Sequence, residues 1–292
     1  MVEGTLLSDT AGGTDHVLDV GGQRITFRRW GQSGPCVLAL HGIPGWRGTW
    51  NSVGEKLASR VQLVAPDMLG FGQSQGPATD GHAQEQAHML ARFVDALGWD
   101  GVHLVGFDFG GPVTVLLAQQ LGNRVRSVCL AATNVLTDNP VPPPLLVARI
   151  PLLGEAFFRV AFGRAGLGLM WRAAVGDTKA FPRAAFNTSL HFPQGVRSTQ
   201  RIFLQSLRNL RRLYQPIEDA LPSITAPCTV LWGSRDPFFS VAAGKRTAAA
   251  IPSSTFILLE GCGHFVPEEK PEAMAQGITA GIERARKARS QQ

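Results

Sequence analysis

The feature that most limits how this chain can fold is a glycine-rich turn between a short apolar run and a longer helical run. The turn, Gly106-Phe107-Asp108-Phe109-Gly110-Gly111, follows apolar residues 102–105 and precedes residues 111–121, which have helical spacing. A short run that is apolar on both faces is typical of a strand in a parallel sheet, and glycines allow a tight turn after it. The turn carries an acid, Asp108, at its apex, where the first amides of the next helix favour a negative charge.

The alternation of strand and helix continues over much of the chain. An amphipathic pattern over residues 83–97 predicts a helix between two strand-like runs. Strands that alternate with helices in this way predict an α/β fold, with a mostly parallel central sheet and helices on both faces. The predicted strands are residues 16–20, 23–30, 36–40, 62–65, 102–105, 125–131, 229–232 and 255–259.

The alternation fails in the middle of the chain, which predicts an inserted unit. Residues 140–144 are rich in proline and are followed by short helical pieces rich in Leu, Phe and Arg. We expect residues 1–135 and 217–292 to form the core domain and residues 136–216 to form a helical cap. The last cap helix is expected over residues 198–213, where apolar residues recur at helical spacing.

Three further segments stand where predicted strands end. In an open parallel sheet, ligands bind beyond the carboxyl ends of the strands, so residues just after each strand are candidates for a site. The three segments, in chain order, are Leu40-His41-Gly42-Ile43-Pro44-Gly45, Gly233-Ser234-Arg235-Asp236 and Gly261-Cys262-Gly263-His264-Phe265.

Taken with the Asp108 turn, these segments resemble the motifs of the α/β-hydrolase fold superfamily, whose chain order is nucleophile, acid, histidine. The resemblance implies that Asp108 is the nucleophile, that His264 is the general base that activates water and that Asp236 is its acid partner. It also implies that the amides of Ile43 and Phe109 face an oxygen that gains charge, a role worth roughly 3 kcal/mol per donor. It covers nearly the whole chain except the cap.

A carboxylate at this turn points to one kind of chemistry within the superfamily. Attack on a carbonyl would give an anhydride, whereas attack at saturated carbon gives an alkyl ester on Asp108 that activated water then cleaves. In this respect the chain resembles the haloalkane dehalogenases and epoxide hydrolases. The expected substrate is a small apolar organic molecule, with water as the second reactant.

The leaving group separates these two activities. An epoxide oxygen needs an acid, and the chain has one tyrosine, Tyr214, with His191 as a candidate second donor. Halide needs no proton but is usually held by an indole next to the nucleophile, where this chain has Phe109; Trp46 or Trp171 could replace it. The single tyrosine favours a haloalkane dehalogenase, with an epoxide hydrolase as the alternative.

Two hypotheses that assign the chain to other functional classes stay open. A ligand receptor could keep the fold with altered chemistry, although it would have no need of His264 and Asp236 to activate water. A lyase or cyclase could use Asp108 as a base instead of a nucleophile.

Composition narrows the partners and the compartment. The net charge is +6, but the cations are spread along the chain and one tyrosine gives few aromatics beside them, so no nucleic-acid partner is expected. No apolar stretch approaches the roughly 20 residues of a membrane span, no secretory signal can be read, and no membrane partner is expected. A cytoplasmic protein without a metal, cofactor or disulfide is predicted, and the sequence does not indicate its oligomeric state.

Overall fold

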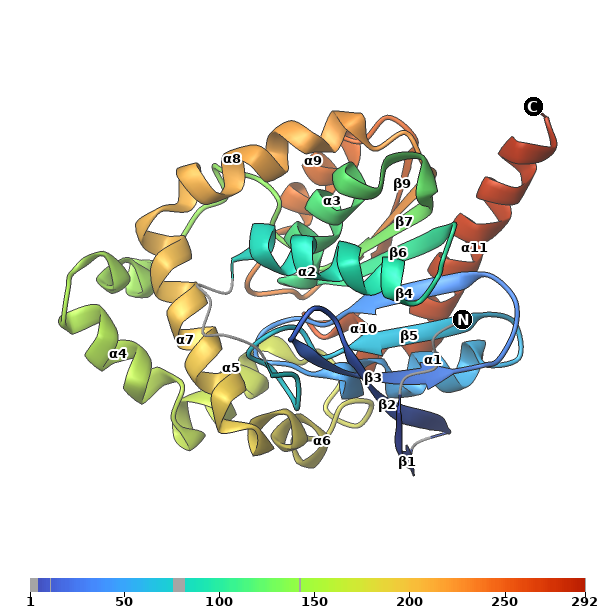
Figure 1. Ribbon diagram of the computed structural model, residues 1–292. Coiled ribbons are helices and arrows are strands. Elements are labelled where there is room, and N and C mark those ends of the chain that lie inside the picture. Colours follow the sequence, from blue (N-terminus) through green and yellow to red (C-terminus); the bar gives the residue numbers. More distant parts are fainter. Residues whose placement is uncertain (1–4, 11, 76–81, 142, 292) are drawn as a thin grey trace.

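One mixed sheet forms the centre of the molecule (Figure 1). The computed structural model describes residues 5–10, 12–75, 82–141 and 143–291. Within these residues nine strands pair in the order β1-β2-β3-β5-β4-β6-β7-β8-β9. Pairing is antiparallel from β1 to β5 and parallel from there to β9. The strands are β1 Thr5–Thr10, β2 Gly13–Asp19, β3 Arg24–Trp30, β4 Cys36–Leu40, β5 Gln62–Pro66, β6 Val102–Phe107, β7 Val125–Ala131, β8 Cys228–Gly233 and β9 Ser254–Leu259.

Helices cover both faces of this sheet. Helices α2, α3 and α9 pack on one face, and α1, α10 and α11 on the other. Strands β4, β5, β6 and β8 are buried along nearly their whole length, which explains their continuous apolar sequences. The predicted α/β fold with a mostly parallel sheet is therefore confirmed. The helices are α1 Asn51–Leu57, α2 Ala83–Ala96, α3 Gly110–Leu121, α9 Val241–Ala249, α10 Val266–Glu269 and α11 Pro271–Ser290.

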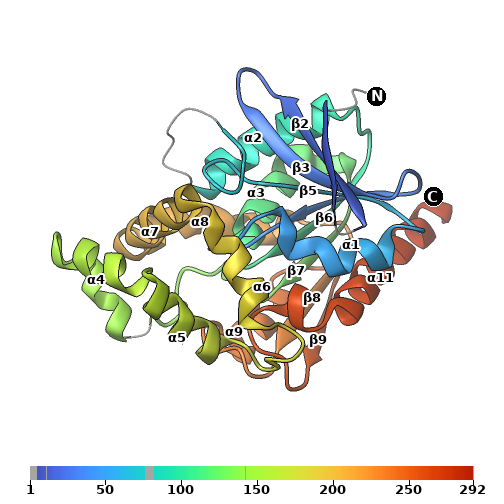
Figure 2. The same ribbon diagram turned by 90° about the horizontal axis from the view of Figure 1, so that it is seen from below.

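A group of helices is inserted between β7 and β8 and lies to one side of the sheet (Figures 1 and 2). The helix predicted over residues 198–213 is divided, because Asn209 has φ −127° and ψ 30° and separates two helices. The expected boundary at residue 216 falls within α8. The inserted elements are the 3₁₀ helices Pro143–Arg149 and Ser189–His191 and the helices α4 Leu153–Ala161, α5 Arg164–Ala174, α6 Arg183–Thr188, α7 Pro193–Arg208 and α8 Leu210–Ala220.

Three further observations concern an edge strand, the cysteines and the lengths of the helices. Strand β1, which the sequence did not predict, pairs antiparallel with β2 at the edge of the sheet. Cys129, Cys228 and Cys262 are buried free thiols, and Cys36 is a half-buried one. Among the residues described, no helix combines the length and the apolar character needed to cross a bilayer.

Candidate active site

Asp108 lies at a strained turn between β6 and α3. Its φ is +51°, in the left-handed region that non-glycine residues rarely adopt. Strain of this kind costs on the order of 1–3 kcal/mol and persists only where surrounding contacts enforce it. Here the Asp108 amide donates to Ala131 O (3.1 Å), and Asp108 O accepts from the Gly111 amide (3.0 Å) and Thr133 Oγ1 (2.6 Å). The backbone that carries the carboxylate is therefore fixed.

Glycines on both sides of Asp108 make room for this turn. A Cβ at Gly106 would lie 2.4 Å from Thr114 Oγ1, and one at Gly110 would lie 2.4 Å from Leu40 O. Neither position has space for a side chain, so the Gly-x-Asp-x-Gly spacing follows from the close approach of β4, β6 and α3.

The two carboxylate oxygens of Asp108 have different surroundings. Its Oδ1 accepts a hydrogen bond from the Ile43 amide at 2.7 Å. Its Oδ2 lies 3.5 Å from His264 Nε2, and the side chain is 12% exposed. A Cβ at Gly42 would lie 2.6 Å from Oδ1, so glycine permits the loop after β4 to approach the acid. The amide of the next residue, Phe109, donates no hydrogen bond to this carboxylate among the residues that the structure describes.

His264 stands between two carboxylates. Its Nδ1 lies 2.9 Å from Asp236 Oδ2, and its Nε2 faces Asp108. The buried Asp236 is itself oriented, because its Oδ1 accepts from the amides of Phe238 (2.8 Å) and Phe239 (3.1 Å). The three candidates predicted from separate strand ends thus form one connected group.

Burial and charge act in opposite directions on His264. Burial disfavours the charged imidazole, but the Asp236 carboxylate and the hydrogen bonds to Asp108 and Asp236 outweigh it and raise the pKa of His264 to about 10. At neutral pH the resting site therefore holds an imidazolium between two carboxylates.

Four aromatic rings surround the imidazole of His264. The rings of Phe107, Phe238, Phe239 and Phe265 lie 5.0–5.6 Å from the imidazole, between ring centroids. Nothing in the sequence around Phe238 and Phe239 predicted that these two rings would pack against His264.

The buried Glu269 fixes the loop that carries His264. Its Oε2 accepts from the amides of Gly263 (3.1 Å), Gly176 (2.8 Å) and Asp177 (2.9 Å). The His264 amide also donates to Ala174 O at 2.8 Å. The histidine loop is thereby joined to the inserted segment after α5, which sequence reasoning did not detect.

Asp108 and His264 open into a cavity of about 610 Å³ beneath the inserted helices. The lining is largely aliphatic and aromatic, with Ser206, Tyr214 and two asparagines among its polar groups. The lining residues from α4, α5, α7 and α8 are Phe157, Phe158, Val160, Ala161, Ala165, Gly166, Leu169, Met170, Ile202, Phe203, Ser206, Leu207, Leu210 and Tyr214.

Tyr214 is the tyrosine of the cavity. Burial and the negative charge of Asp108 raise the pKa of Tyr214 to about 12, although a hydrogen bond with Ser206 opposes the shift. The phenol therefore stays protonated at neutral pH and is available as a donor.

The other three pocket candidates lie elsewhere. Trp46, Trp171 and His191 are not among the residues that line this cavity. Trp46 packs against Phe192, with ring centroids 5.2 Å apart, and the Trp171 indole donates to Phe181 O at 3.2 Å. The His191 side chain is exposed to solvent. None of these three placements could be inferred from residue spacing alone.

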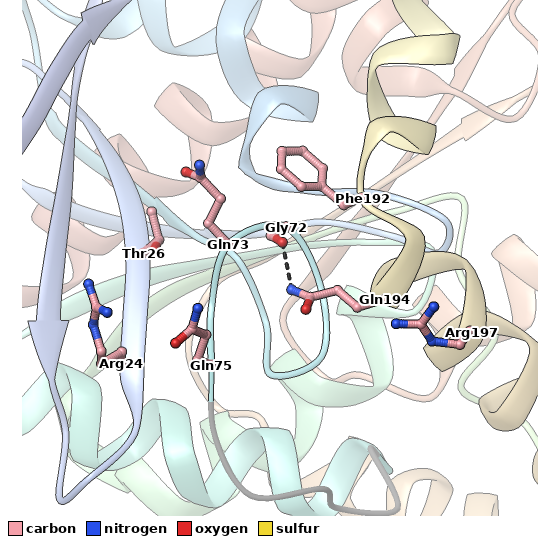
Figure 3. A pocket seen from close by; sticks show the side chains of 8 residues that line it. All are labelled: Arg24, Thr26, Gly72, Gln73, Gln75, Phe192, Gln194 and Arg197. Atoms are coloured by element: carbon pink, nitrogen blue, oxygen red, sulfur yellow. Dashed lines mark hydrogen bonds between the residues drawn. The ribbon is translucent and has the colours of Figure 1, made fainter.

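A second pocket, of about 580 Å³, lies between β3, the loop after β5 and the start of α7 (Figure 3). Arg24 and Arg197 lie on either side of it, and Gln194 Nε2 donates to Gly72 O at 2.7 Å. None of the three catalytic candidates lines this pocket. Over the described residues, no three His, Cys, Asp or Glu side chains group as metal ligands.

A family model for the alpha/beta hydrolase fold matches residues 35–271. This range includes β4, all three members of the Asp108 group and the inserted helices. The chain therefore belongs to the alpha/beta hydrolase fold family, as its motifs indicated.

Individual relatives share most of the chain at modest identity. Haloalkane dehalogenase 2 of Mycobacterium tuberculosis is 29% identical over 279 residues, which are 92% of each chain. The cis-3-alkyl-4-alkyloxetan-2-one decarboxylase of Xanthomonas campestris is 28% identical over 270 residues, covering 86% of this chain and 89% of the relative. The solved structure of the epoxide hydrolase CorEH superposes with a TM-score of 0.76 at 22% identity, over 93% of this chain and 99% of the other, and shows the shared fold.

Proposed function

We propose that the protein is a hydrolase that displaces a leaving group at saturated carbon and passes through an alkyl ester on Asp108. The observation that carries this proposal is the unequal environment of the two carboxylate oxygens. Oδ1 is held by the Ile43 amide, whereas Oδ2 faces His264, and the Asp108 side chain lines the cavity. In this proposal Oδ2 attacks the substrate, and Oδ1 remains as the ester carbonyl oxygen. In this proposal residues 136–216 act as the cap that encloses the substrate.

The first step needs no base, because a carboxylate attacks carbon without giving up a proton. Oδ2 forms a bond to the substrate carbon, and the bond from that carbon to its leaving group breaks. If the leaving atom is oxygen, it takes the phenolic proton of Tyr214. His264 then releases its proton, directly or through solvent, to restore Tyr214.

Ester formation itself prepares His264 for the second step. The ester carries no charge, so the imidazolium loses one of its two carboxylate partners and its pKa falls. Neutral His264 can then take a proton from water that attacks Cγ of Asp108. The charge that develops on Oδ1 is stabilised by the Ile43 amide, with Phe109 as the proposed second donor. His264 returns the proton to the departing product oxygen and then takes the carboxyl proton left on Asp108, which restores the carboxylate and the imidazolium.

The cavity favours a strained oxygen ring as the electrophile. Tyr214 supplies a proton donor in the cavity beside Asp108, and the residues that line the cavity include no tryptophan that could bind halide. An epoxide in an apolar molecule fits these features best, so the preference for halide drawn from the tyrosine count is reversed in this proposal. The oxetan-2-one in the name of the Xanthomonas relative is also a strained oxygen ring, but it is a cyclic ester, and its ring oxygen would leave saturated carbon as a carboxylate without needing a proton.

Dehalogenation is the second candidate. It is favoured by the haloalkane dehalogenase relative, which matches nearly the full length of the chain, and by the apolar lining of the cavity. Halide departs without a proton, so Tyr214 would have no essential role in that reaction.

Trapping the ester tests the mechanism. His264→Gln enzyme is incubated with panels of epoxides, oxetan-2-ones and haloalkanes, and the Asp108 peptide is then weighed by mass spectrometry. We expect that peptide to gain the mass of one substrate molecule, less halide where halide leaves. No adduct from any panel would overturn the alkyl-ester mechanism.

Heavy-oxygen water gives an independent reading in the wild-type enzyme. In a single turnover the label should appear in the Asp108 carboxylate, while the product receives its new oxygen from Asp108. Label that enters the product directly would indicate attack by water on the substrate. Absence of label from both would favour a lyase or cyclase, and tight binding without turnover would favour a receptor.

A further inference from the structure

The exposed large apolar side chains of the described chain gather on one region. Six of the seven lie between residues 146 and 169, in the 3₁₀ helix before α4, in the turn that follows it, in α4 and in α5; the seventh, Leu258, is on β9. In both views α4 lies at the outer edge of the inserted helices, away from the sheet (Figures 1 and 2). We call this surface the outer cap face; its apolar residues are Leu146, Ile150, Leu152, Leu153, Val160 and Leu169.

The exposure of these side chains is large, and two of them share one side of α4. Leu152 is 83% exposed, Val160 77% and Leu169 70%. Leu153 and Val160 are seven residues apart, so they lie on the same side of α4. Isolated exposed leucines are ordinary on protein surfaces, but a group of this size marks an interaction site.

The outer cap face borders the opening of the reactive cavity. Val160 and Leu169 are exposed to solvent and also line the cavity that contains Asp108. Helices α4 and α5 contact one another, and both supply cavity residues. Two side chains of this face are therefore shared between the outer surface and the cavity that contains Asp108.

Positive charge accompanies the apolar residues. Residues 136–216 contain 11 Lys and Arg against three Asp and Glu, whereas the whole chain contains 28 and 22. Outside this segment acids outnumber bases, so the net positive charge of the protein resides in the cap. Three exposed arginines, Arg149, Arg159 and Arg172, are interspersed with the apolar residues of the outer cap face.

We propose that the outer cap face docks on the surface of an anionic lipid bilayer and takes apolar substrate into the cavity from it. Amphipathic helices bind bilayers when exposed apolar side chains enter the interface and nearby cations meet anionic headgroups. A second copy of this chain fits less well, because pairing the two faces would bring two strongly positive surfaces together. The expectation of no membrane partner rested on the lack of a spanning segment, and peripheral binding does not require one.

Vesicle co-sedimentation tests this proposal without any assay of activity. The whole protein is spun with vesicles of phosphatidylcholine alone or of phosphatidylcholine mixed with phosphatidylglycerol. We expect binding to the mixed vesicles at least about tenfold stronger than to the neutral ones, and weakened by salt. Equal binding to both, or binding to neither, would overturn the proposal.

Matched variants locate the surface. Leu152→Gln with Leu153→Gln should weaken binding to the mixed vesicles severalfold, whereas Leu258→Gln should not change it. Arg159→Gln should weaken vesicle binding more than Arg60→Gln. The Arg60 change removes an exposed arginine that lies outside the inserted helices. Circular dichroism checks that each variant is folded. If the paired variants have equal effects, or if light scattering shows a dimer that the leucine double variant dissociates, the outer cap face does not dock on lipid.

Discussion

The two walls of the cavity that contains Asp108 are built by different means. On the core side, Asp108 lines the cavity and Asp236 lies behind His264, and both acids are fixed by backbone hydrogen bonds at the end of a strand. On the side of the inserted helices, the lining is mainly apolar, and Tyr214 with its partner Ser206 supplies its hydroxyl groups. Polar groups fixed by backbone tolerate little change, whereas apolar helix faces can be exchanged with modest loss. The comparison suggests that the core wall determines the reaction and the helical wall determines the substrate and the leaving group.

Replacement of the proposed nucleophile is the strongest test of the core wall. Asp108→Asn removes the carboxylate of the proposed nucleophile but keeps the shape, and asparagine tolerates the left-handed backbone of this turn. We expect kcat to fall about 10⁴-fold or more with the fold retained. Steady-state kinetics measures the loss, and intact mass excludes conversion back to aspartate.

Asp138→Asn is the matched control for this change. Asp138 is an exposed acid that pairs with Arg246 on the surface. We therefore expect kcat of the Asp138→Asn enzyme to stay within about twofold of the wild-type value. If Asp108→Asn falls no further than this control, the core wall does not supply the nucleophile.

The helical wall is tested by removing its phenol. Tyr214→Phe should slow opening of an oxygen ring roughly 10²–10³-fold in kcat, because a positioned general acid contributes on that order. Haloalkane turnover should change much less, since halide needs no proton. Parallel kinetics on matched epoxide and haloalkane substrates measures the contrast. Equal losses on both substrates would mean that Tyr214 only shapes the cavity.

The difference between the two walls also explains what could be read from the sequence. Asp108, Asp236 and His264 each follow a strand of the parallel sheet, and parallel strands bring their carboxyl ends to one edge. Their proximity was therefore predictable from strand positions and glycine spacing alone. Their catalytic roles stay proposals.

The helical wall could not be predicted in the same way. Helices without a sheet to align them can rotate, and rotation decides whether Trp171 or Tyr214 faces the cavity. The break at Asn209 separates α7 from α8 and was not expected from the apolar repeat. Glu269 was missed because its three amide partners come from two distant segments, which only tertiary packing brings together.

The charge balance of the core wall predicts a dependence of stability on pH. The pKa of His264 is about 10 in the folded protein, against an ordinary value near 6.5. Its contribution to stability is therefore fully present below about pH 6.5 and is lost as pH rises through 10. The effect should be on the order of a few kcal/mol in the free energy of unfolding.

Comparison with Asp108→Asn isolates this effect. Without the Asp108 charge the pKa of His264 should be lower, so the difference in unfolding free energy between wild type and variant should shrink above about pH 8. Glu268, whose pKa burial raises to about 8, titrates in both proteins and largely cancels. Urea unfolding at a series of pH values measures the difference. A difference that stays constant up to pH 10 would contradict the charged triad.

The smallest effect is expected where Glu269 connects the His264 loop of the core wall to the inserted segment of the helical wall. Glu269→Gln keeps the size of the side chain but weakens its hydrogen bonds to the amides of Gly176, Asp177 and Gly263. We expect a loss of about 1–2 kcal/mol in the free energy of unfolding, since hydrogen bonds to charged groups contribute on that scale. A fall in kcat of up to about tenfold should accompany it, because the His264 loop loses part of its support. Glu272→Gln, which changes an exposed acid paired with Lys56, is the control and should alter neither quantity appreciably. Loss of stability with unchanged kcat would show that the inserted helices can loosen without disturbing His264, and that the core wall is independent of the helical one.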